Sequence, residues 1–274
     1  MPARATVRCL LAVLLVVAAL AGATTTAAAG EHPRPGRHPE LNWMGSTVRK
    51  HEPGVADPVP AAALAAASVE GVDVSSHQGN VNWSALKNDG VRFAYVKATE
   101  GNYYSNPYFG RQYNGSYGAG MLRGAYHFAT PDDSSGPTQA NYFVNRGGGW
   151  SRDGRTLPGV LDIEYNPYGS TCYGKSKSAM VSWIRDFSTT YRSRTGRYPV
   201  IYTTVNWWKQ CTGNYSGFGA NNPLWLARYG STPGEIPAGW SYQTFWQYTS
   251  EGPIVGDHNK FNGTYERLKV MATG

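Results

Sequence analysis

Residues 157–166 read LPGVLDIEYN, and this stretch decides how the fold is interpreted. Its centre, residues 160–164, is apolar and β-branched up to two carboxylates, which indicates a buried strand that ends in charge. Side chains alternate between the two faces of a strand, so Asp162 and Glu164 point the same way, about 7 Å apart along the backbone. Burying two carboxyl groups is costly unless they are paired, hydrogen-bonded or open to a cleft. The stretch therefore predicts an active site, with a solvated strand end as the alternative.

The chain around this stretch alternates predicted strands and helices. Strands are expected over residues 69–75, 91–98, 122–129, 160–164, 199–203, 224–228, 244–248 and 256–261. Helices are expected over residues 83–88, 106–118, 137–145 and 176–194, and none beyond residue 205. About eight strands with helices only between the first five predict an α/β fold, a modified TIM-like β/α barrel whose last part lacks helices. An open doubly wound sheet is the alternative.

Polar residues gather at the expected C-terminal ends of the strands. They are Asp73, Glu100, His127, Asp162, Glu164, Tyr202, Arg228, Gln247 and Asp257. In β/α barrels the chemistry takes place at that rim, so this distribution favours the barrel over the open sheet.

The first 29 residues have the pattern of a secretory signal peptide. Arg4 and Arg8 precede an apolar run over residues 10–20, and small residues follow, ending in an A-x-A pattern at residues 27–29. The run is short for a membrane span and no second apolar run follows, so we expect a secreted, extracellular protein without a membrane anchor after cleavage.

Residues 30–68 are rich in proline and contain an alanine-rich tract over residues 61–67. Such a segment cannot bury enough apolar surface to order itself, so we interpret it as a pro-segment or linker, removed near Ala67. Residues 41–44, LNWM, are the one piece expected to dock on something. The catalytic domain is predicted over residues 69–274.

Cysteine and charge content agree with export. Cys9 leaves with the signal peptide, and the remaining pair, Cys172 and Cys211, is expected to form a disulfide worth roughly 4 kcal/mol in the loop-entropy model. No Cys or His cluster has the spacing of metal ligands. The formal net charge is +7, which favours polyanionic partners such as cell-wall polymers. Basic residues are scattered, so nucleic acid is not expected as a partner.

Aromatic residues make up 13% of the chain, and many Tyr and Trp stand beside Gly and Asn. Such residues suit a surface for flat sugar rings, although any single one is more often part of a core.

Six ordered motifs together resemble glycoside hydrolase family 25, the secreted N-acetylmuramidases often called Chalaropsis-type lysozymes. They are GVDVSSHQG (residues 71–79), FAYVKATEG (93–101), GAYHFA (124–129), LDIE (161–164), FWQY (245–248) and DHNKFNG (257–263). The resemblance runs from about residue 69 to the C-terminus. It implies a modified β/α barrel without its last helices and hydrolysis of the β-1,4 bond between N-acetylmuramic acid and N-acetylglucosamine in peptidoglycan, with no metal or organic cofactor.

The resemblance also implies roles for four acids. Glu164 is similar to the family's general acid, and Asp162 to the group that holds the 2-acetamido group or a developing positive charge. Asp73 and Asp257 match the other two active-site acids. The last motif departs from the family at His258, where an apolar residue is common.

The chemistry fits these residue types independently of the family. Glycoside cleavage needs an acid to protonate the leaving oxygen and a negative group to stabilise an oxocarbenium-like transition state. Acids crowded at one rim raise the pKa of at least one of them, and we predict Glu164 to carry that proton. An Asp-x-Glu pair favours retention through the substrate's acetamido group, with inversion left open.

Substrate-binding candidates lie on the same strands. Lys97 and Arg228 could attract acidic groups of the glycan, Tyr126 and Trp246 could contact sugar rings, and Gln247 could bond a hydroxyl or acetamido group. The alternatives are solvated charges, core packing and strand-end bonding, and His127 is expected to be structural.

Three functional hypotheses remain open on the sequence. The first is a muramidase acting on peptidoglycan glycan strands as a monomer. The second is a chitinase-like enzyme, disfavoured because the longer acidic motif expected there is absent. The third is a wall-binding module without catalysis, disfavoured because all four acids are present. No nucleophile elbow exists, which argues against ester or peptide hydrolysis.

Overall fold

The computed structural model describes Met1, residues 36–52 and residues 68–274. Apart from Met1, the predicted signal peptide lies outside the described residues, as does the expected cleavage point at Ala67. The chain divides into two units, Met1–Gly30 and Glu31–Gly274, and the second contains every element below.

Within residues 68–274, eight strands close into a barrel, because β1 pairs with both β2 and β9. The strands are β1 Ser68–Val74, β2 Phe93–Glu100, β4 Leu122–Phe128, β5 Val160–Asp162, β6 Val200–Thr203, β7 Leu224–Ala227, β8 Phe245–Thr249 and β9 Asp257–Asn262. A short strand, β3 (Tyr104–Ser105), adds to the end of β2. The predicted barrel is confirmed, and the open sheet is wrong.

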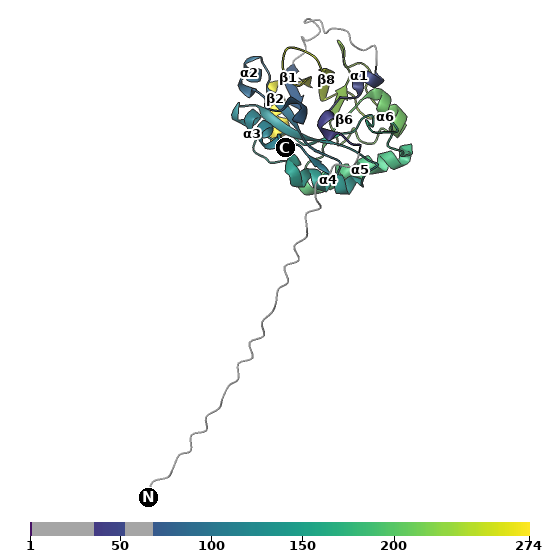
Figure 1. Ribbon diagram of the computed structural model, residues 1–274, viewed down its shortest axis with the longest axis horizontal. Coiled ribbons are helices and arrows are strands. Elements are labelled where there is room, and N and C mark those ends of the chain that lie inside the picture. The colour runs from purple at the N-terminus through teal and green to yellow at the C-terminus, as the bar shows by residue number, and fades with distance from the viewer. Residues whose placement is uncertain (2–35, 53–67) are drawn as a thin grey trace. The chain divides into compact units, whose positions relative to one another are not determined.

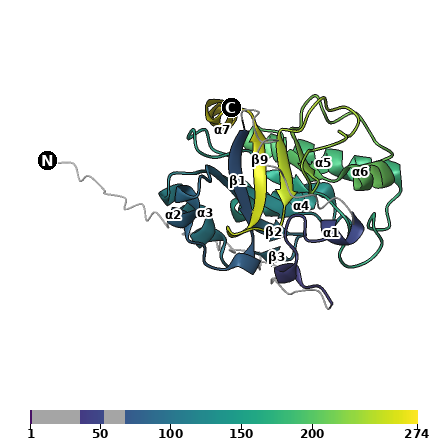
Figure 2. The same cartoon turned by 90° about the horizontal axis from the view of Figure 1, so that it is seen from above.

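Seven of these strands run parallel, whereas β9 runs antiparallel to both of its neighbours. The start of β9 therefore lies beside the end of β1, and Asp257 stands opposite Asp73. Figure 2 shows the pair, with α7 (Tyr265–Thr273) beyond the other end of β9. Reversing the last strand brings its first residue to the rim where the parallel strands end.

Helices cover the outside of the barrel (Figure 1). They are α2 Trp83–Asn88, α3 Phe109–Gly118, α4 Gly136–Phe143 with a π-turn over Val144–Gly148, α5 Lys177–Thr195 and α6 Val205–Thr212, besides α7 and a 3-10 turn, η3, over Ser76–Gln78. The longest, α5, begins at Ser176, whose hydroxyl accepts the Ala179 amide, and ends at Gly196 in the left-handed region.

Two helices, α6 and α7, lie in the part of the chain for which no helix was expected. Thr204 caps α6 by accepting the Trp207 amide, and Gly213 ends it. In α6 the adjacent Trp207 and Trp208 are both buried, so no spaced apolar stripe is visible in the sequence. The capping residues at its two ends were the signal that could have revealed it.

Aromatic side chains fill the barrel interior. The ring of Trp225 lies 4.9 Å from that of Tyr95 and 5.1 Å from that of Phe245, between centroids. Phe93 and Tyr126 belong to the same buried cluster. A second cluster packs α4 and α5 against the outside of the sheet. Apart from Tyr126, these aromatic residues therefore belong to the core rather than to a sugar-binding surface.

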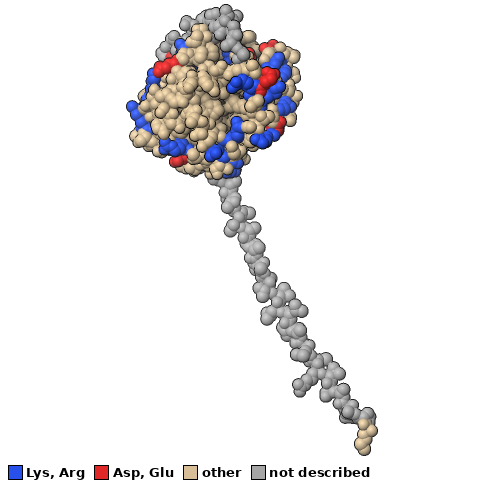
Figure 3. Space-filling view, turned by 180° about the vertical axis from the view of Figure 1, so that it is seen from behind, with Lys and Arg blue, Asp and Glu red and all other residues tan. Residues whose placement is uncertain are grey.

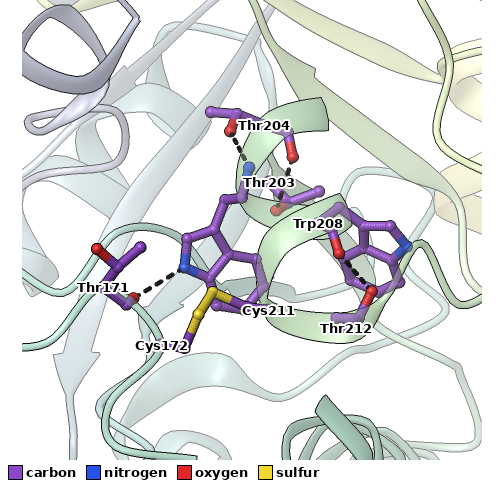
Figure 4. Close-up of a disulfide and its surroundings, with 8 residues drawn as sticks. Thr171, Cys172, Thr203, Thr204, Trp208, Cys211 and Thr212 are labelled. Carbon is purple, nitrogen blue, oxygen red and sulfur yellow. Dashed lines mark hydrogen bonds between the residues drawn. A yellow bond between two sulfur atoms is a disulfide. The ribbon is translucent and has the colours of Figure 1, made fainter. Parts of the chain in front are cut away.

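The expected disulfide between Cys172 and Cys211 is present, with 5.3 Å between the Cα atoms (Figure 4). It ties the loop after β5 to α6. Beside it, the Trp207 indole donates a hydrogen bond of 3.1 Å to the Thr171 carbonyl. The loop that follows Glu164 is thus held at two adjacent points.

Residues 37–52, which we call the plug, contain the 3-10 turn η1 (Pro39–Leu41) and the one-turn helix α1 (Val48–His51). They were expected to lack order apart from residues 41–44. Met44 and Val48 are fully buried, whereas Leu41 is exposed. The purple ribbon of η1 and α1 in Figure 2 lies at the end of β1 and β9 away from α7. The plug is ordered because the barrel supplies the apolar surface that the segment lacks.

On the face shown in Figure 3, Lys and Arg lie in separate groups among Asp, Glu and uncharged residues rather than in one patch. Among the described residues, no helix is both long and apolar enough to cross a membrane.

Candidate active site

Asp162 is the last residue of β5, and Glu164 follows it after one residue. The Ile163 amide donates to the Tyr202 carbonyl at 3.0 Å, so the backbone stays strand-like beyond Asp162. Ile163 packs in the outer core. The carboxyl groups of Asp162 and Glu164 lie on the opposite side, and both residues are fully buried.

Asp73 and Asp257 form a second pair across β1 and β9. The side-chain amide of Gln247 donates to Asp73 Oδ2 at 3.0 Å and to Asp257 Oδ2 at 3.2 Å. Asn259 Nδ2 also donates to Asp73 Oδ2, at 2.8 Å. Gln247 therefore sits between these two acids, as a residue on the inner face of β8.

Two tyrosine hydroxyls donate hydrogen bonds to the side-chain oxygen of Gln247. Tyr202 and Tyr229 donate to its Oε1 at 2.7 Å and 3.2 Å. Sequence reasoning did not single out Tyr229 or Asn259. Asn259 could have been found, because it follows Asp257 by two residues on the same face of a strand. Tyr229 lies beyond the end of β7, where no periodicity applies.

All four acids have raised pKa values. Burial raises the pKa of Glu164 to about 7, against hydrogen bonds that favour its ionised form. Burial also raises the pKa of Asp73 to about 7, against hydrogen bonds from Asn259 and Gln247 and with a further rise from the charge of Glu164.

The pKa of Asp162 is held well above its usual range by burial and then by the charge of Glu164. Burial and the charge of Asp73 do the same for the pKa of Asp257. These mutual effects place the four predicted acids within electrostatic reach of one another. Both oxygens of Asp162 have no hydrogen-bond partner in the described part of the chain.

Lys97 is also fully buried, and it forms a 2.7 Å ion pair with Glu100. Tyr103 and Tyr168 donate to the other oxygen of Glu100, at 2.8 Å and 2.5 Å. Lys97 also donates to two carbonyl groups of the plug. Glu100 is thus satisfied within the barrel, while part of the hydrogen-bonding capacity of Lys97 faces the mouth of the barrel.

The structure separates the remaining candidates. The hydroxyl of Tyr126 accepts the Met44 amide of the plug at 3.3 Å, so it faces the site. Trp246 is on the opposite face of β8 from Gln247, and its indole donates to the Arg228 carbonyl at 2.7 Å. The Arg228 guanidinium bonds the Thr232 hydroxyl at 3.2 Å. Trp246 and Arg228 therefore lie outside the group of acids.

His127 is a structural residue, as expected. Its ring nitrogens lie 2.7 Å from Thr99 Oγ1 and 2.9 Å from Gln139 Oε1. Burial lowers the pKa of His127 to about 3, which keeps the ring neutral. Among the described residues, no group of three or more His, Cys, Asp and Glu side chains is arranged to hold a metal ion.

The carboxyl group of Glu164 is occupied by the plug. The Gly45 amide donates to its Oε1 at 2.7 Å, and the Thr47 hydroxyl donates to its Oε2 at 2.6 Å. The arrangement is a cluster of buried acids, and some of them hold protons near neutral pH. The plug lies over this cluster.

Comparison with known proteins agrees with this geometry. Residues 72–257 match the family model for glycosyl hydrolases family 25. Lysozyme M1 of Streptomyces globisporus is 48% identical over 263 residues, which cover 93% of this chain and 90% of the relative. An N,O-diacetylmuramidase of Chalaropsis sp is 49% identical over 211 residues, which cover 76% of this chain and all of the relative.

Solved structures give the same result. A muramidase from Acremonium alcalophilum shares 54% identity with a TM-score of 0.74, over 75% of this chain and 99% of that one. A family GH25 lysozyme from Aspergillus fumigatus shares 53% identity with a TM-score of 0.75, over 76% of this chain and the whole of that one. The chain therefore belongs to the glycosyl hydrolases of family 25.

Proposed function

We propose that this glycoside hydrolase is a secreted, monomeric muramidase that cleaves the β-1,4 bond between N-acetylmuramic acid and N-acetylglucosamine in peptidoglycan. The relatives named lysozyme and muramidase, which match about half of its residues over most of its length, support this activity. The signal pattern of residues 1–29 supports secretion.

The observation that carries the proposal is the set of four buried carboxyl groups with raised pKa values. An acid catalyst must hold a proton at working pH, and a pKa of about 7 allows Glu164 to do so. A carboxyl group with its ordinary pKa would be ionised there almost completely.

In the proposed reaction Glu164 gives its proton to the glycosidic oxygen as the bond from that oxygen to C1 breaks. The acetamido oxygen of the substrate bonds to C1, which keeps the positive charge from building up there. Water then attacks C1 as the bond from C1 to the acetamido oxygen breaks, and the water gives a proton to Glu164, which restores the acid. The unpartnered oxygens of Asp162 support its role in accepting the acetamido N–H.

Asp73 and Asp257 complete the negative field around the developing cation. Gln247 and Asn259 hold Asp73 in position, so these amides act as positioning residues. Tyr126 and Lys97 are proposed to contact the glycan, because both present polar atoms to the same opening.

Glu164→Gln tests the acid. Gln keeps the shape but carries no transferable proton, so clearing of a peptidoglycan suspension is expected to slow by about 10²–10⁴-fold. Glu266→Gln on the exposed face of α7 serves as the control and should leave the rate unchanged. A Glu164→Gln protein that clears walls at the normal rate would contradict the assignment.

The stereochemistry tests the acetamido route. Retention is expected, so NMR of the first products should show the β-anomer of muramic acid before mutarotation. An α-anomer as the first product would require a water molecule to attack directly.

A further inference from the structure

We propose that residues 37–52 act as an internal inhibitor that fills the active site and keeps the full chain inactive. This inference rests on the proposed function only in naming what is blocked. The plug occupies the groups that a glycan would have to reach, and it is held at both ends by the walls of the barrel.

At the centre of the plug, its polar groups complement the acid. Both donors from the plug, the Gly45 amide and the Thr47 hydroxyl, point at the two oxygens of Glu164. An amide can only donate, so the pair is best satisfied when Glu164 is a carboxylate. These two hydrogen bonds thus favour the form of Glu164 that has no proton to transfer, and they oppose the rise in its pKa that burial causes.

Backbone carbonyl groups of the plug accept hydrogen bonds from neighbouring side chains. The Met44 carbonyl accepts from Gln247 at 2.8 Å, and the Gly45 carbonyl accepts from Tyr229 at 3.1 Å. The carbonyls of Pro39 and Asn42 accept from Lys97 at 3.0 Å and 2.6 Å. A glycan presents similar acceptors in its hydroxyl and acetamido oxygens, so the plug and a glycan would compete for the same donors.

Side chains anchor the plug on both sides of the mouth. At its start Arg37 lies 3.0 Å from carboxyl oxygens of both Asp132 and Asp133. The guanidinium also lies 4.5 Å from the ring centre of Tyr168, and the Trp43 ring stacks on His77 at 4.6 Å. These contacts join the plug to loops that follow β4, β5 and β1.

At its end, the plug contacts residues that follow β5, β6 and β8. His51 stacks on Tyr165 at 4.1 Å, and Glu52 accepts from Tyr165 at 2.9 Å and from Asn206 at 2.8 Å. Arg49 lies 3.2 Å from Glu251, though this pair is solvent-exposed and adds little. The plug therefore spans the opening rather than resting on one edge of it.

The fit is tightest at Gly45, whose φ is +91°. A Cβ atom added there would lie 2.3 Å from Gln247 Oε1, 2.6 Å from the Tyr229 hydroxyl and 2.7 Å from the Tyr202 hydroxyl. No side chain can enter this space without moving the plug or the catalytic groups.

The share of this chain that aligns differs among the relatives, as expected if the plug is separable from the barrel. The Chalaropsis enzyme and the Acremonium structure are covered almost entirely by about three quarters of this chain. Residues 68–274 also make up about three quarters of its length, so a match of that extent needs no more of this chain than the barrel. Lysozyme M1 aligns over 93% of this chain, which a match limited to the barrel could not reach.

Covalent connection makes the block effective. Residues 53–67 join the plug to β1, so its binding is intramolecular, with an effective concentration of roughly millimolar order. Once the connection is cut, the plug would leave by dilution, and soluble glycan would no longer face a competitor at that concentration.

The test compares residues 30–274 with two glycine variants and with residues 68–274 alone. Gly45→Leu forces a side chain into the filled space. Gly36→Leu is the matched control, because Gly36 also has a positive φ, +79°, but has nothing within 4 Å of an added Cβ. Peptidoglycan clearing by Gly45→Leu and by the barrel alone is expected to be about tenfold or more faster than clearing by the parent or Gly36→Leu.

Two further measurements do not depend on catalysis. The backbone amides of residue 45 and of Glu52 should exchange slowly with deuterium in the parent and in Gly36→Leu. Both should exchange fast in Gly45→Leu. Soluble peptidoglycan fragments should bind the barrel alone about tenfold or more tightly than the parent in calorimetry.

The possible failures can be told apart. A parent that clears walls and binds fragments as well as the barrel alone does would overturn the inhibitor. A barrel that binds fragments more tightly than the parent, yet clears no walls, would refute the proposed muramidase while supporting the block.

Discussion

At the scale of single residues, the proposed role of Asp162 would place function in conflict with stability. Its carboxyl group is fully buried, and neither oxygen has a hydrogen-bond partner in the described part of the chain. A buried polar group without partners costs free energy of folding, and such groups persist mainly where a substrate supplies the missing bond.

Asp162→Asn is therefore expected to make the fold more stable and the enzyme less active. Removing the ionisable group should raise the free energy of unfolding by about 1–3 kcal/mol at pH 8, because the carboxylate no longer has to be buried. Denaturant unfolding and wall clearing measure the two effects. A variant that is destabilised at pH 8 would show that Asp162 is well compensated in the folded state.

The raised pKa values of Asp73 and Glu164, both about 7, predict how stability depends on pH. A carboxyl group with a folded pKa above its unfolded value binds protons more strongly in the folded state. Stability is therefore greatest below the unfolded pKa and falls as the pH rises towards 7.

We expect the free energy of unfolding of the protein to fall between pH 4 and pH 7.5. In Asp73→Asn the fall in the free energy of unfolding over this interval should be smaller by about 2–4 kcal/mol. Hydrogen bonds from the backbone and Thr156 lower the pKa of the exposed Asp153 to about 2 against partial desolvation, so its contribution to stability is lost only below that range. Denaturant titrations across the interval measure the slope, and an unchanged slope in Asp73→Asn would contradict the assignment.

At the scale of elements, the position of Glu164 depends on the loop after it as well as on the strand before it. β5 ends at Asp162, and the chain after Glu164 passes Tyr165 and Tyr168 before reaching Cys172. The disulfide fixes this loop to α6, which Thr204 caps at its start. A loop tied in this way helps to keep the Glu164 side chain in place although β5 is short.

Removing the disulfide is therefore expected to affect both stability and activity. The double variant Cys172→Ala with Cys211→Ala should lose about 2–4 kcal/mol in the free energy of unfolding. Its kcat should also fall, because the loop that follows Glu164 becomes mobile. Thermal unfolding and wall clearing measure these changes, and a variant with reduced stability but full kcat would show that the loop holds its shape unaided.

At the scale of the whole molecule, the plug and the barrel form one cooperative unit, because the plug buries Met44 and Val48 against the barrel. A segment that binds only the folded state stabilises it. Residues 30–274 are thus expected to unfold several degrees above residues 68–274 in calorimetry. Equal transition temperatures would show that the plug contributes no net binding free energy.

Residue patterns alone predicted the barrel and the group of four acids at its mouth. Parallel strands read as apolar runs that end in charge, and strand alternation placed Asp162 with Glu164 on one face. Among the longer elements of residues 68–274, α6, α7 and the antiparallel direction of β9 were not predicted. Adjacent buried tryptophans concealed α6, and α7 lies beyond the last strand.

The contacts of the four acids depend on tertiary structure and could not be predicted from local sequence. Gln247 could be recognised as a rim residue, but its place between Asp73 and Asp257 depends on the closing pair of strands, whose partners are far apart in sequence. Trp246, on the same strand, faces the other way and stays outside the site. The plug was interpreted from composition as a segment unable to order itself. Its order comes from burial against the barrel, and no local pattern within residues 37–52 encodes a surface that the rest of the chain provides.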